Sequence, residues 1–389
     1  MNNRMKAVLC GAAAAGAVAF AAAPASAQTK IVLHDLGGVA GSPAEAGFRI
    51  AASYWESVLT NNVTIEFNVG FEDLGPDILG GTRTSLYTYV PIQDYYDALT
   101  ANGVSALDAQ AIAHLQPLSA TGSVAPIVPG YLNPATQTGV ASSGTRIGPD
   151  GQPISNTIAV ASSVWQALTG DTAGVDAEIQ FSSTFAFDFN PIDGISHSEY
   201  DFIGVAIHEM GHALGFLSGT EDFDYVAGWY GDSVDDAWWG YASDLFKYSA
   251  EGQLNWNFDT PSYFSIDGGK TAFLGDSYWS TGTAQGDGWQ ASHWKSPPGE
   301  GCSGFVGIMN PYICNGLVDS VTANDLGLLD AIGWNVNVDV LANPNYNFTT
   351  AQVRAAVPEA SSWMMMILGF GAIGGAMRYR TRRATVSYA

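Results

Sequence analysis

The hydrophobic pattern of the first seventy residues predicts a strand, a helix and a second strand. Residues 30–34 form a short run with strand character, and Pro43 is well placed to open a helix. The apolar residues that then recur at helical spacing are Phe48, Ala52, Trp55 and Leu59. Residues 63–69 alternate between apolar and polar side chains, as in a half-buried strand. This order of elements indicates an α/β layer.

Further along, the pattern predicts helices and strands separated by loops rich in Gly, Pro and Ser. The ranges with helical character are 93–115, 162–168 and 321–332. Mostly alternating apolar residues predict a strand at 177–189, and an Asp-Gly-Gly turn predicts a hairpin within 263–274. The polar, Asn-rich stretch 341–356 is predicted to be a linker. We therefore expect one folded domain, residues 28–340, ahead of that linker.

The sequence GVAIHEMGHALGF at residues 204–216 carries the clearest chemical signal. Ser198 and Asp201 precede it with the Ser-x-x-Asp spacing of a capping box, which predicts that a helix begins there. The residues on the apolar side of this helix are Phe202, Val205, Ala206, Met210, Ala213, Leu214 and Leu217. The pattern therefore predicts a short, buried helix that carries the histidines.

The HExxH motif within this helix has the spacing of a zinc site. Residues i and i+4 share one helix face, so His208 and His212 can present two imidazoles to one ion. Glu209 lies about 100° around the helix, where it can act as a general base on a metal-bound water. Catalytic zinc usually takes three protein ligands, so a third is required. In the compact form of the motif, the third ligand follows Gly215 at the position of Ser218, which is a poor zinc ligand.

A single histidine follows this helix, His293 in the sequence ASHWKSPPGEGCSGFVGIMNPYIC. A distant ligand is tolerable because the entropic cost of closing a loop grows only logarithmically with its length. An acidic third ligand, for instance Asp235 or Asp236, is the alternative. The upstream histidines, expected at the surface or as satisfied core residues, are His34, His114 and His197.

The composition permits a large folded core, with 47% apolar, 12% aromatic and 13% charged residues. A net charge of −23 excludes a general phosphate-binding surface and argues against nucleic acid as a partner. Scattered Asp and Asn side chains could also hold Ca²⁺, although no stretch matches an EF-hand loop.

The amino terminus has the three parts of a secretory signal peptide. Arg4 and Lys6 precede the apolar run 7–23, and an Ala-Ser-Ala cleavage site ends at Ala27. We expect residues 1–27 to be removed on export. A retained membrane anchor is the weaker alternative, because a helix-breaking proline and the cleavage site follow the apolar run at once.

The cysteines fit an exported protein. Cys10 lies in the signal peptide, so the mature chain keeps Cys302 and Cys314, an even pair in an oxidising compartment. A disulfide between them would close a small loop around residues 307–311 and contribute about 3 kcal/mol by the loop-entropy model. Two free thiols are the alternative.

The carboxyl end combines an apolar segment, 364–377, with a basic stop. The arginines of that stop are Arg378, Arg380, Arg382 and Arg383, and together with Trp363 they favour membrane insertion. The segment 357–384 resembles the PEP-CTERM sorting signal of Gram-negative bacteria, which an exosortase recognises. The resemblance implies a transient transmembrane anchor in the inner membrane, followed by release or attachment at the cell surface. A permanent single-span anchor is the alternative.

The sequences HEMGHALGF, SHW and GIMNP together resemble the leishmanolysin-type metzincins, in which a long insertion displaces the third histidine and a methionine turn follows. The likeness covers roughly residues 198–335. It implies an α+β fold with an N-terminal mixed sheet, helices that include the HExxH helix, and an irregular C-terminal subdomain. The site residues that it implies are His208, His212 and His293 as zinc ligands, Glu209 as general base, Met309 beneath the zinc, and Gly215 at the turn.

These features predict an exported zinc-dependent metalloendopeptidase that hydrolyses protein or peptide substrates. Glu209 would take a proton from a zinc-bound water and return it to the leaving amine. The strand within 177–189, just before the active helix, is a candidate for pairing with an extended substrate. The alternative is a non-enzymatic cell-surface or biofilm-matrix protein that retains a metzincin-like fold, which the acidic, aromatic body and the sorting segment suggest.

Overall fold

A computed structural model describes residues 28–75, 79–172, 174–296 and 301–357. The predicted signal peptide and the predicted sorting segment beyond residue 357 lie outside these ranges. Within them, no helix combines the length and the hydrophobicity that are needed to cross a membrane. The described residues form a mixed α+β fold, the class that the family resemblance implies.

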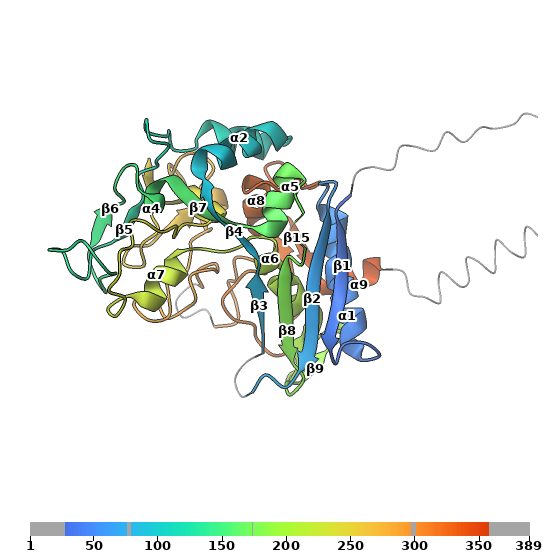
Figure 1. The fold of residues 1–389 in the computed structure, drawn as a ribbon. Coiled ribbons are helices and arrows are strands. Elements are labelled where there is room, and N and C mark those ends of the chain that lie inside the picture. The colour runs from blue at the N-terminus through green and yellow to red at the C-terminus, as the bar shows by residue number, and fades with distance from the viewer. Residues whose placement is uncertain (1–27, 76–78, 173, 297–300, 358–389) are drawn as a thin grey trace, which may run out of the picture.

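A four-stranded mixed sheet organises the N-terminal half (Figure 1). In spatial order its strands are β1 (Lys30–Gly37), β2 (Thr64–Glu72), β8 (Ala177–Ser182) and β3 (Gly80–Thr84). Strands β1, β2 and β8 are parallel, and β3 runs antiparallel to β8. Parallel strands need a crossover, and helix α1 (Pro43–Val58) supplies the one between β1 and β2. The predicted strand–helix–strand order is therefore confirmed.

Helix α6 (Phe202–Ala213) is held against α1 and the sheet by an aromatic cluster around its first residue, Phe202. The rings whose centroids lie 4.6–6.0 Å from that of Phe202 are Phe48, Phe71, Phe181, Phe187 and Phe189. A Cβ on Gly47 of α1 would overlap the Phe202 ring, so the two helices approach closely there. Just before α6, β9 (Phe187–Asp188) and β10 (Tyr200–Asp201) form a short parallel pair. The predicted strand 177–189 is thus two strands.

A group of short elements connects β3 to β8. Its paired strands are β4 (Leu86–Pro91) with β7 (Thr157–Ala161), and β5 (Ile127–Pro129) with β6 (Thr145–Ile147). Its helices are α2 (Ile92–Asn102), α3 (Ala106–Ala113), α4 (Pro153–Asn156) and α5 (Ser162–Thr169). The single helix predicted at 93–115 is wrong. Gly103 takes an extended conformation, and Ser105 and Asp108 form a capping box that begins a second helix.

The chain after α6 folds into short elements joined by irregular segments. They are α7 (Thr220–Val226), β11 (Lys247–Ala250), β12 (Gln253–Leu254), β13 (Tyr263–Phe264), and 3₁₀ turns at Ala242–Phe246 and Phe273–Gly275. The hairpin predicted within 263–274 is wrong, because β13 pairs with β11 instead. The carboxylate of Asp267 accepts hydrogen bonds from the backbone and hydroxyl of Thr271, which turns the Asp-Gly-Gly segment back on itself.

The last elements of the fold are β14 (Ser320–Thr322), α8 (Ala323–Ala331), β15 (Asn347–Thr349) and α9 (Thr350–Ala356). Strands β14 and β15 pair antiparallel, and Thr350 and Val353 of α9 are buried. The Thr350 hydroxyl donates to the buried carboxylate of Asp201. The linker predicted at 341–356 is therefore wrong, and the folded domain continues to residue 356. Its polar composition hid the helix, because a short helix with one packed face needs few apolar residues.

The aromatic cluster predicts that Phe202→Ala lowers the free energy of unfolding by about 3–5 kcal/mol, because a buried ring is replaced by a cavity. Phe202→Leu should lose less, since it keeps most of the apolar volume. Chemical denaturation of the purified domain measures both. Tyr225, which is 74% exposed, provides the control, and Tyr225→Ala should change stability by under about 0.5 kcal/mol. Equal stability of Phe202→Ala and the wild type would show that the cluster does not fix α6.

Candidate metal centre

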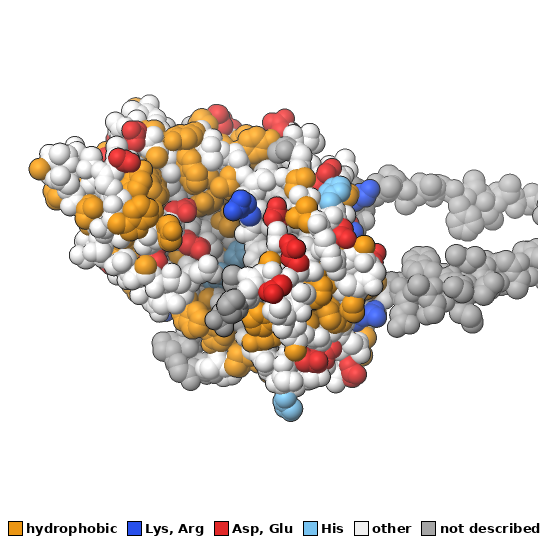
Figure 2. Space-filling model, turned by 60° about the horizontal axis from the view of Figure 1, so that its bottom comes forward, with side chains coloured by type: hydrophobic (Ala, Val, Ile, Leu, Met, Phe, Trp, Pro, Cys, Tyr) orange, Lys and Arg blue, Asp and Glu red, His pale blue; other side chains and the backbone are white. Residues whose placement is uncertain are grey.

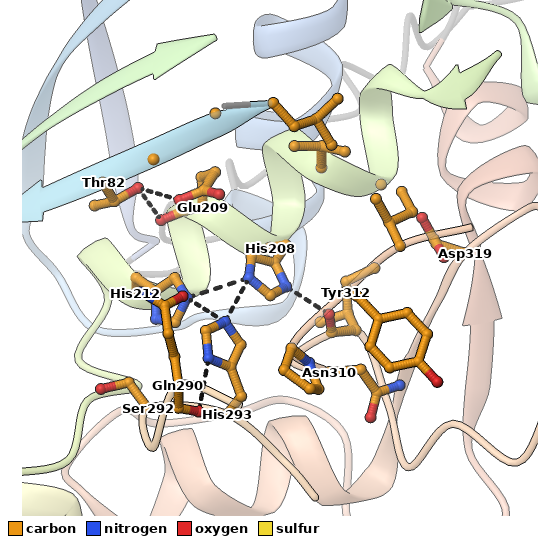
Figure 3. A pocket seen from close by; sticks show the side chains of 18 of the residues that line it. Thr82, His208, Glu209, His212, Gln290, Ser292, His293, Asn310, Tyr312 and Asp319 are labelled. Atoms are coloured by element: carbon orange, nitrogen blue, oxygen red, sulfur yellow. Dashed lines mark hydrogen bonds between the residues drawn. The ribbon is translucent and has the colours of Figure 1, made fainter. Parts of the chain in front are cut away.

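Three histidine rings converge where α6 meets the irregular half of the domain (Figure 3). His208 and His212 come from α6, and His293 comes from the chain after β13. Their Nε2 atoms lie 3.1–3.2 Å from one another. The structure thus brings together the three histidines that the sequence singles out.

The acidic residues considered as an alternative third ligand are not in this cluster. Asp235 forms an ion pair with Arg146 at 2.6 Å and accepts a hydrogen bond from Tyr131. Asp236 is exposed. Among the described residues, the grouping with metal-ligand geometry consists of the three histidines alone.

The second ring nitrogen of each histidine faces a backbone carbonyl. The Nδ1–oxygen pairs are His208 with Ile308 at 2.7 Å, His212 with Phe216 at 2.8 Å, and His293 with Gln290 at 3.2 Å. A carbonyl oxygen can only accept, so each Nδ1 is assigned the hydrogen. Each neutral ring then directs the lone pair of its Nε2 toward the other two rings. This is the tautomer in which histidine binds a metal through Nε2.

Three lone pairs at this separation repel one another, and a cation between them removes the repulsion. Tetrahedral zinc with Zn–N distances of about 2.0–2.1 Å separates its ligand nitrogens by about 3.3–3.4 Å. The separations here are close to that value. Burial lowers the pKa of His212 to about 3 and the pKa of His293 well below its usual range, which favours the neutral, metal-binding form. The residues present therefore fit a zinc ion.

The N-terminus of α6 is capped by Asp201. Asp201 is the N-cap residue, and its carboxylate accepts the backbone N–H of Gly204 at 3.0 Å. The capping box predicted with Ser198 is therefore wrong. Ser198 is an exposed residue before β10, so α6 begins one turn later than that prediction implies.

The C-terminus of α6 ends in a Schellman turn at Gly215, whose φ is +101°. The backbone N–H of Phe216 donates to Gly211 O, and that of Gly215 donates to His212 O. A side chain at Gly215 would meet both the positive φ and the side chains of Val164 and Ile332. The turn also brings the carbonyl of Phe216 to Nδ1 of His212. One glycine thus ends the helix and positions the carbonyl that sets the tautomer of His212.

Glu209 faces β3 and is oriented by Thr82 (Figure 3). The Thr82 hydroxyl lies 2.8 Å from Glu209 Oε2 and 3.0 Å from the Glu209 carbonyl oxygen. Burial raises the pKa of the Glu209 carboxyl, while His208 and Thr82 oppose that shift. A carboxyl held beside the three nitrogens without joining them is arranged for proton transfer. No local pattern in the sequence points to Thr82, because its contact with Glu209 depends on where β3 pairs in the sheet.

Met309 packs against α6 between the two turns that carry His208 and His212. A Cβ on Gly211 would overlap the sulfur of Met309, which is 1% exposed. The backbone N–H of Trp294, the residue after His293, donates to Met309 O at 2.9 Å. The methionine turn and the segment of the third histidine are therefore joined directly.

A buried carboxylate that sequence analysis missed, Asp325, holds this arrangement together. It accepts the backbone N–H groups of Ile308 at 2.9 Å, Met309 at 3.3 Å and Thr322 at 2.7 Å. It also accepts the indole N–H of Trp294 at 2.9 Å. One side chain thus ties the methionine turn and the third-histidine segment to the start of α8. Its signal in the sequence was the Thr-x-x-Asp capping box of α8.

The predicted disulfide between Cys302 and Cys314 is present, with Cα atoms 5.9 Å apart. It closes the loop that contains Met309. The same loop supplies Pro311, Tyr312 and Ile313 to a cleft that opens at the histidines. The disulfide therefore restrains both the cleft wall formed by residues 311–313 and the position of Met309 against α6.

This cleft has a volume of about 560 Å³. Besides the histidines and the disulfide loop, its lining includes Gly80, Gly81, Thr82, Glu209 and Asp319. Figure 2 shows histidine atoms at the bottom of a hollow on the face turned to the viewer. The candidate ligands and base are therefore accessible to a substrate.

Comparisons with protein-family models, curated proteins and solved structures find no match for this chain. Its function is therefore inferred from the geometry of the site.

We expect Asp325→Asn to lower the free energy of unfolding by about 3–5 kcal/mol, because an amide nitrogen replaces one acceptor and leaves buried N–H groups unpaired. The same change should weaken zinc binding, because the Ile308 carbonyl orients the His208 ring and Trp294 directly follows His293 in the chain. Thermal unfolding and a competition assay with a chromophoric chelator measure the two effects. The matched control is Asp339→Asn, which removes an exposed carboxylate that accepts a single local N–H bond. Equal losses in both variants would contradict the role of Asp325.

Gly211→Ala should weaken zinc binding roughly tenfold or more, although alanine favours a helix by about 1 kcal/mol over glycine. The new methyl group must displace Met309 and, with it, the helix face beneath the histidines. A double-mutant cycle with Met309→Ala checks the cause, using zinc affinity as the readout. The added methyl should cost much less once the methionine is shortened. Equal costs in both backgrounds would rule out this contact.

Proposed function

We propose that this chain is a zinc-dependent endopeptidase of metzincin type that hydrolyses peptide bonds outside the cytoplasm. The observation that supports it most is the set of three imidazoles with their Nε2 lone pairs converging, beside the carboxyl of Glu209 in an open cleft. A structural zinc site would be closed by a fourth protein ligand. In the described residues the cluster has three histidines and no fourth ligand, and all three line an open cleft.

His208, His212 and His293 would hold the ion, and their Nδ1 bonds to backbone carbonyls keep the rings oriented without it. Bound zinc would supply Lewis acidity toward a water molecule and a substrate carbonyl. Glu209 would accept the proton of the attacking water and pass it to the leaving nitrogen. The Thr82 hydroxyl bonds the Glu209 carboxyl, and both residues line the cleft. Burial raises the pKa of the Glu209 carboxyl, which favours a group that both accepts and returns a proton.

An extended peptide fits this cleft best along β3. The strand order β1-β2-β8-β3 leaves β8 with neighbours on both sides. The part of the predicted strand 177–189 that forms β8 therefore has no free edge for a substrate. Strand β3 is at the edge of the sheet, and Gly80, Gly81 and Thr82 line the cleft. Its outward backbone groups offer hydrogen bonds to a peptide laid alongside, which is the usual mode of β-augmentation.

The metzincin assignment is supported by the Gly215 turn, by Met309 against the HExxH helix, and by the distant third histidine. Export is supported by the disulfide between Cys302 and Cys314, which persists in an oxidising compartment. Removal of residues 1–27, anchoring through the segment 357–384 and processing by an exosortase complete the proposal. With these two segments, the proposed location of the mature enzyme is the surface of a Gram-negative cell or its surroundings.

Two variants separate metal binding from hydrolysis. Glu209→Gln should keep stoichiometric zinc and lose roughly 10²–10⁴-fold in the rate of casein or peptide cleavage, because the proton acceptor is gone. His293→Ala should lose zinc, because two imidazoles from one helix do not complete the site. Metal content by atomic emission and cleavage of a quenched fluorescent peptide are the measurements.

The matched control is His114→Ala, because the His114 ring bonds the Gln110 carbonyl one turn earlier in the chain and does not line the cleft. It should change neither zinc content nor rate. Retention of zinc by His293→Ala would contradict the ligand set. Zinc binding by the wild type without any hydrolysis would favour the non-enzymatic surface protein instead.

A further inference from the structure

Beyond His208, the cleft extends to a second carboxyl group, that of Asp319. Asp319 lines the cleft and packs on α6 at Gly204, one turn before His208, where a Cβ on the glycine would overlap its Oδ2. Figure 3 shows Asp319 on the side of His208 away from Glu209. A side chain that enters this part of the cleft therefore meets Asp319.

The carboxyl of Asp319 has no hydrogen-bond donor within the described part of the chain. Its neighbour Asp201 takes the available donors, namely Gly204 N–H at 3.0 Å, Asp319 N–H at 3.3 Å and the Thr350 hydroxyl. Asp319 itself is held through its backbone, whose carbonyl accepts the N–H of Thr350 at 2.9 Å. The backbone of Asp319 is therefore held on both sides of the Cα atom, while no donor of the described residues bonds its two carboxylate oxygens.

No basic side chain of the described residues balances this acidic pair. In the described part of the chain, the ion pairs of lysine and arginine involve carboxyl groups other than those of Asp201 and Asp319. Burial and the nearby Asp201 raise the pKa of Asp319 well above its usual range. This environment opposes a second negative charge unless a cation accompanies it. A ligand that brings a positive charge would satisfy both oxygens.

The cleft offers apolar surface to the stem of such a ligand. The apolar and aromatic residues that share the lining with Asp319 are Tyr200, Val205, Ile308, Tyr312 and Ile313. Lysine and arginine have long methylene stems that pack on apolar walls while the charged end reaches a carboxylate. Arginine can make two parallel hydrogen bonds to it. An acidic side chain would add like charge, and an aliphatic one would leave Asp319 unpaired.

We propose that Asp319 makes the cleft selective for peptides that place an arginine or lysine side chain beyond His208. This inference rests on the proposed peptidase function and narrows its substrate class. A general attraction of basic peptides to the acidic protein, whose Asp and Glu side chains are spread over the face in Figure 2, would also favour cations. The test must separate the two effects.

The test uses peptide hydroxamates, which bind catalytic zinc and carry one variable residue next to the metal-binding group. Four compounds differ only in that residue, which is arginine, lysine, norleucine or glutamate. Calorimetry with the zinc-loaded protein gives their affinities without any hydrolysis. We expect arginine to bind at least about tenfold more tightly than norleucine, as for a hydrogen-bonded ion pair. Glutamate should bind most weakly.

In Asp319→Asn, the ratio of arginine to norleucine affinity should fall to about one, while norleucine affinity stays the same. The matched control is Glu199→Gln, which removes the same charge from a residue whose backbone bonds Gly316 near Asp319 but which does not line the cleft. It should keep the ratio of the wild type. An equal loss in both variants would assign the preference to overall charge and overturn the proposal.

Cleavage of a mixed peptide library by the wild type, mapped by mass spectrometry, separates this inference from the proposed function. Cleavage without a basic residue at a fixed position from the broken bond overturns the role of Asp319 and leaves the peptidase standing. A hydroxamate preference that Asp319→Asn abolishes, without cleavage of any peptide, supports the pocket and overturns the peptidase. Failure to bind zinc overturns both.

Discussion

The central constraint on this structure is the close approach of three imidazole rings, whose Nε2 atoms lie 3.1–3.2 Å from one another. Three neutral imidazoles point their Nε2 lone pairs at one another because three backbone carbonyls, from Ile308, Phe216 and Gln290, hold the Nδ1 hydrogens. Each of these carbonyls belongs to a different feature of the chain: the methionine turn, the Schellman turn that ends α6, and the segment of the third ligand. The structure around the site holds those three carbonyls in place, and the carbonyls in turn orient the three rings.

Buried aspartates perform that task in a chain with few basic residues. Asp325 gathers the N–H groups of the methionine turn and α8, and Asp201 joins α6 to α9 and the residue before β14. Asp244 does the same farther out, accepting the N–H groups of Gly219 and Tyr241 beside the buried amine of Lys247. Hydrogen bonds from several backbone donors offset the cost of burying each charge. An irregular subdomain can thereby be rigid without long strands or helices.

The features that could be predicted from the sequence are those that are encoded locally. The β1–α1–β2 unit, the HExxH helix and its terminal glycine follow from periodicity and turn chemistry, and His293 and Cys302 to Cys314 follow from the scarcity of those residue types. Features that depend on partners distant in the sequence could not be predicted. The segment 341–356 is polar yet folds because β14 and Asp201 offer it partners, and β13 pairs with β11 rather than across its own turn. The roles of Thr82, Asp319 and Asp325 likewise exist only once strands and loops have met.

The most direct test of the metal centre is X-ray diffraction from crystals of the zinc-loaded protein, with data collected on both sides of the zinc absorption edge. We expect one anomalous peak in the cleft, about 2.0–2.1 Å from Nε2 of His208, His212 and His293. We also expect that no other protein atom completes the coordination. An anomalous map without a peak there, or a peak from which the His293 ring is turned away, would contradict it.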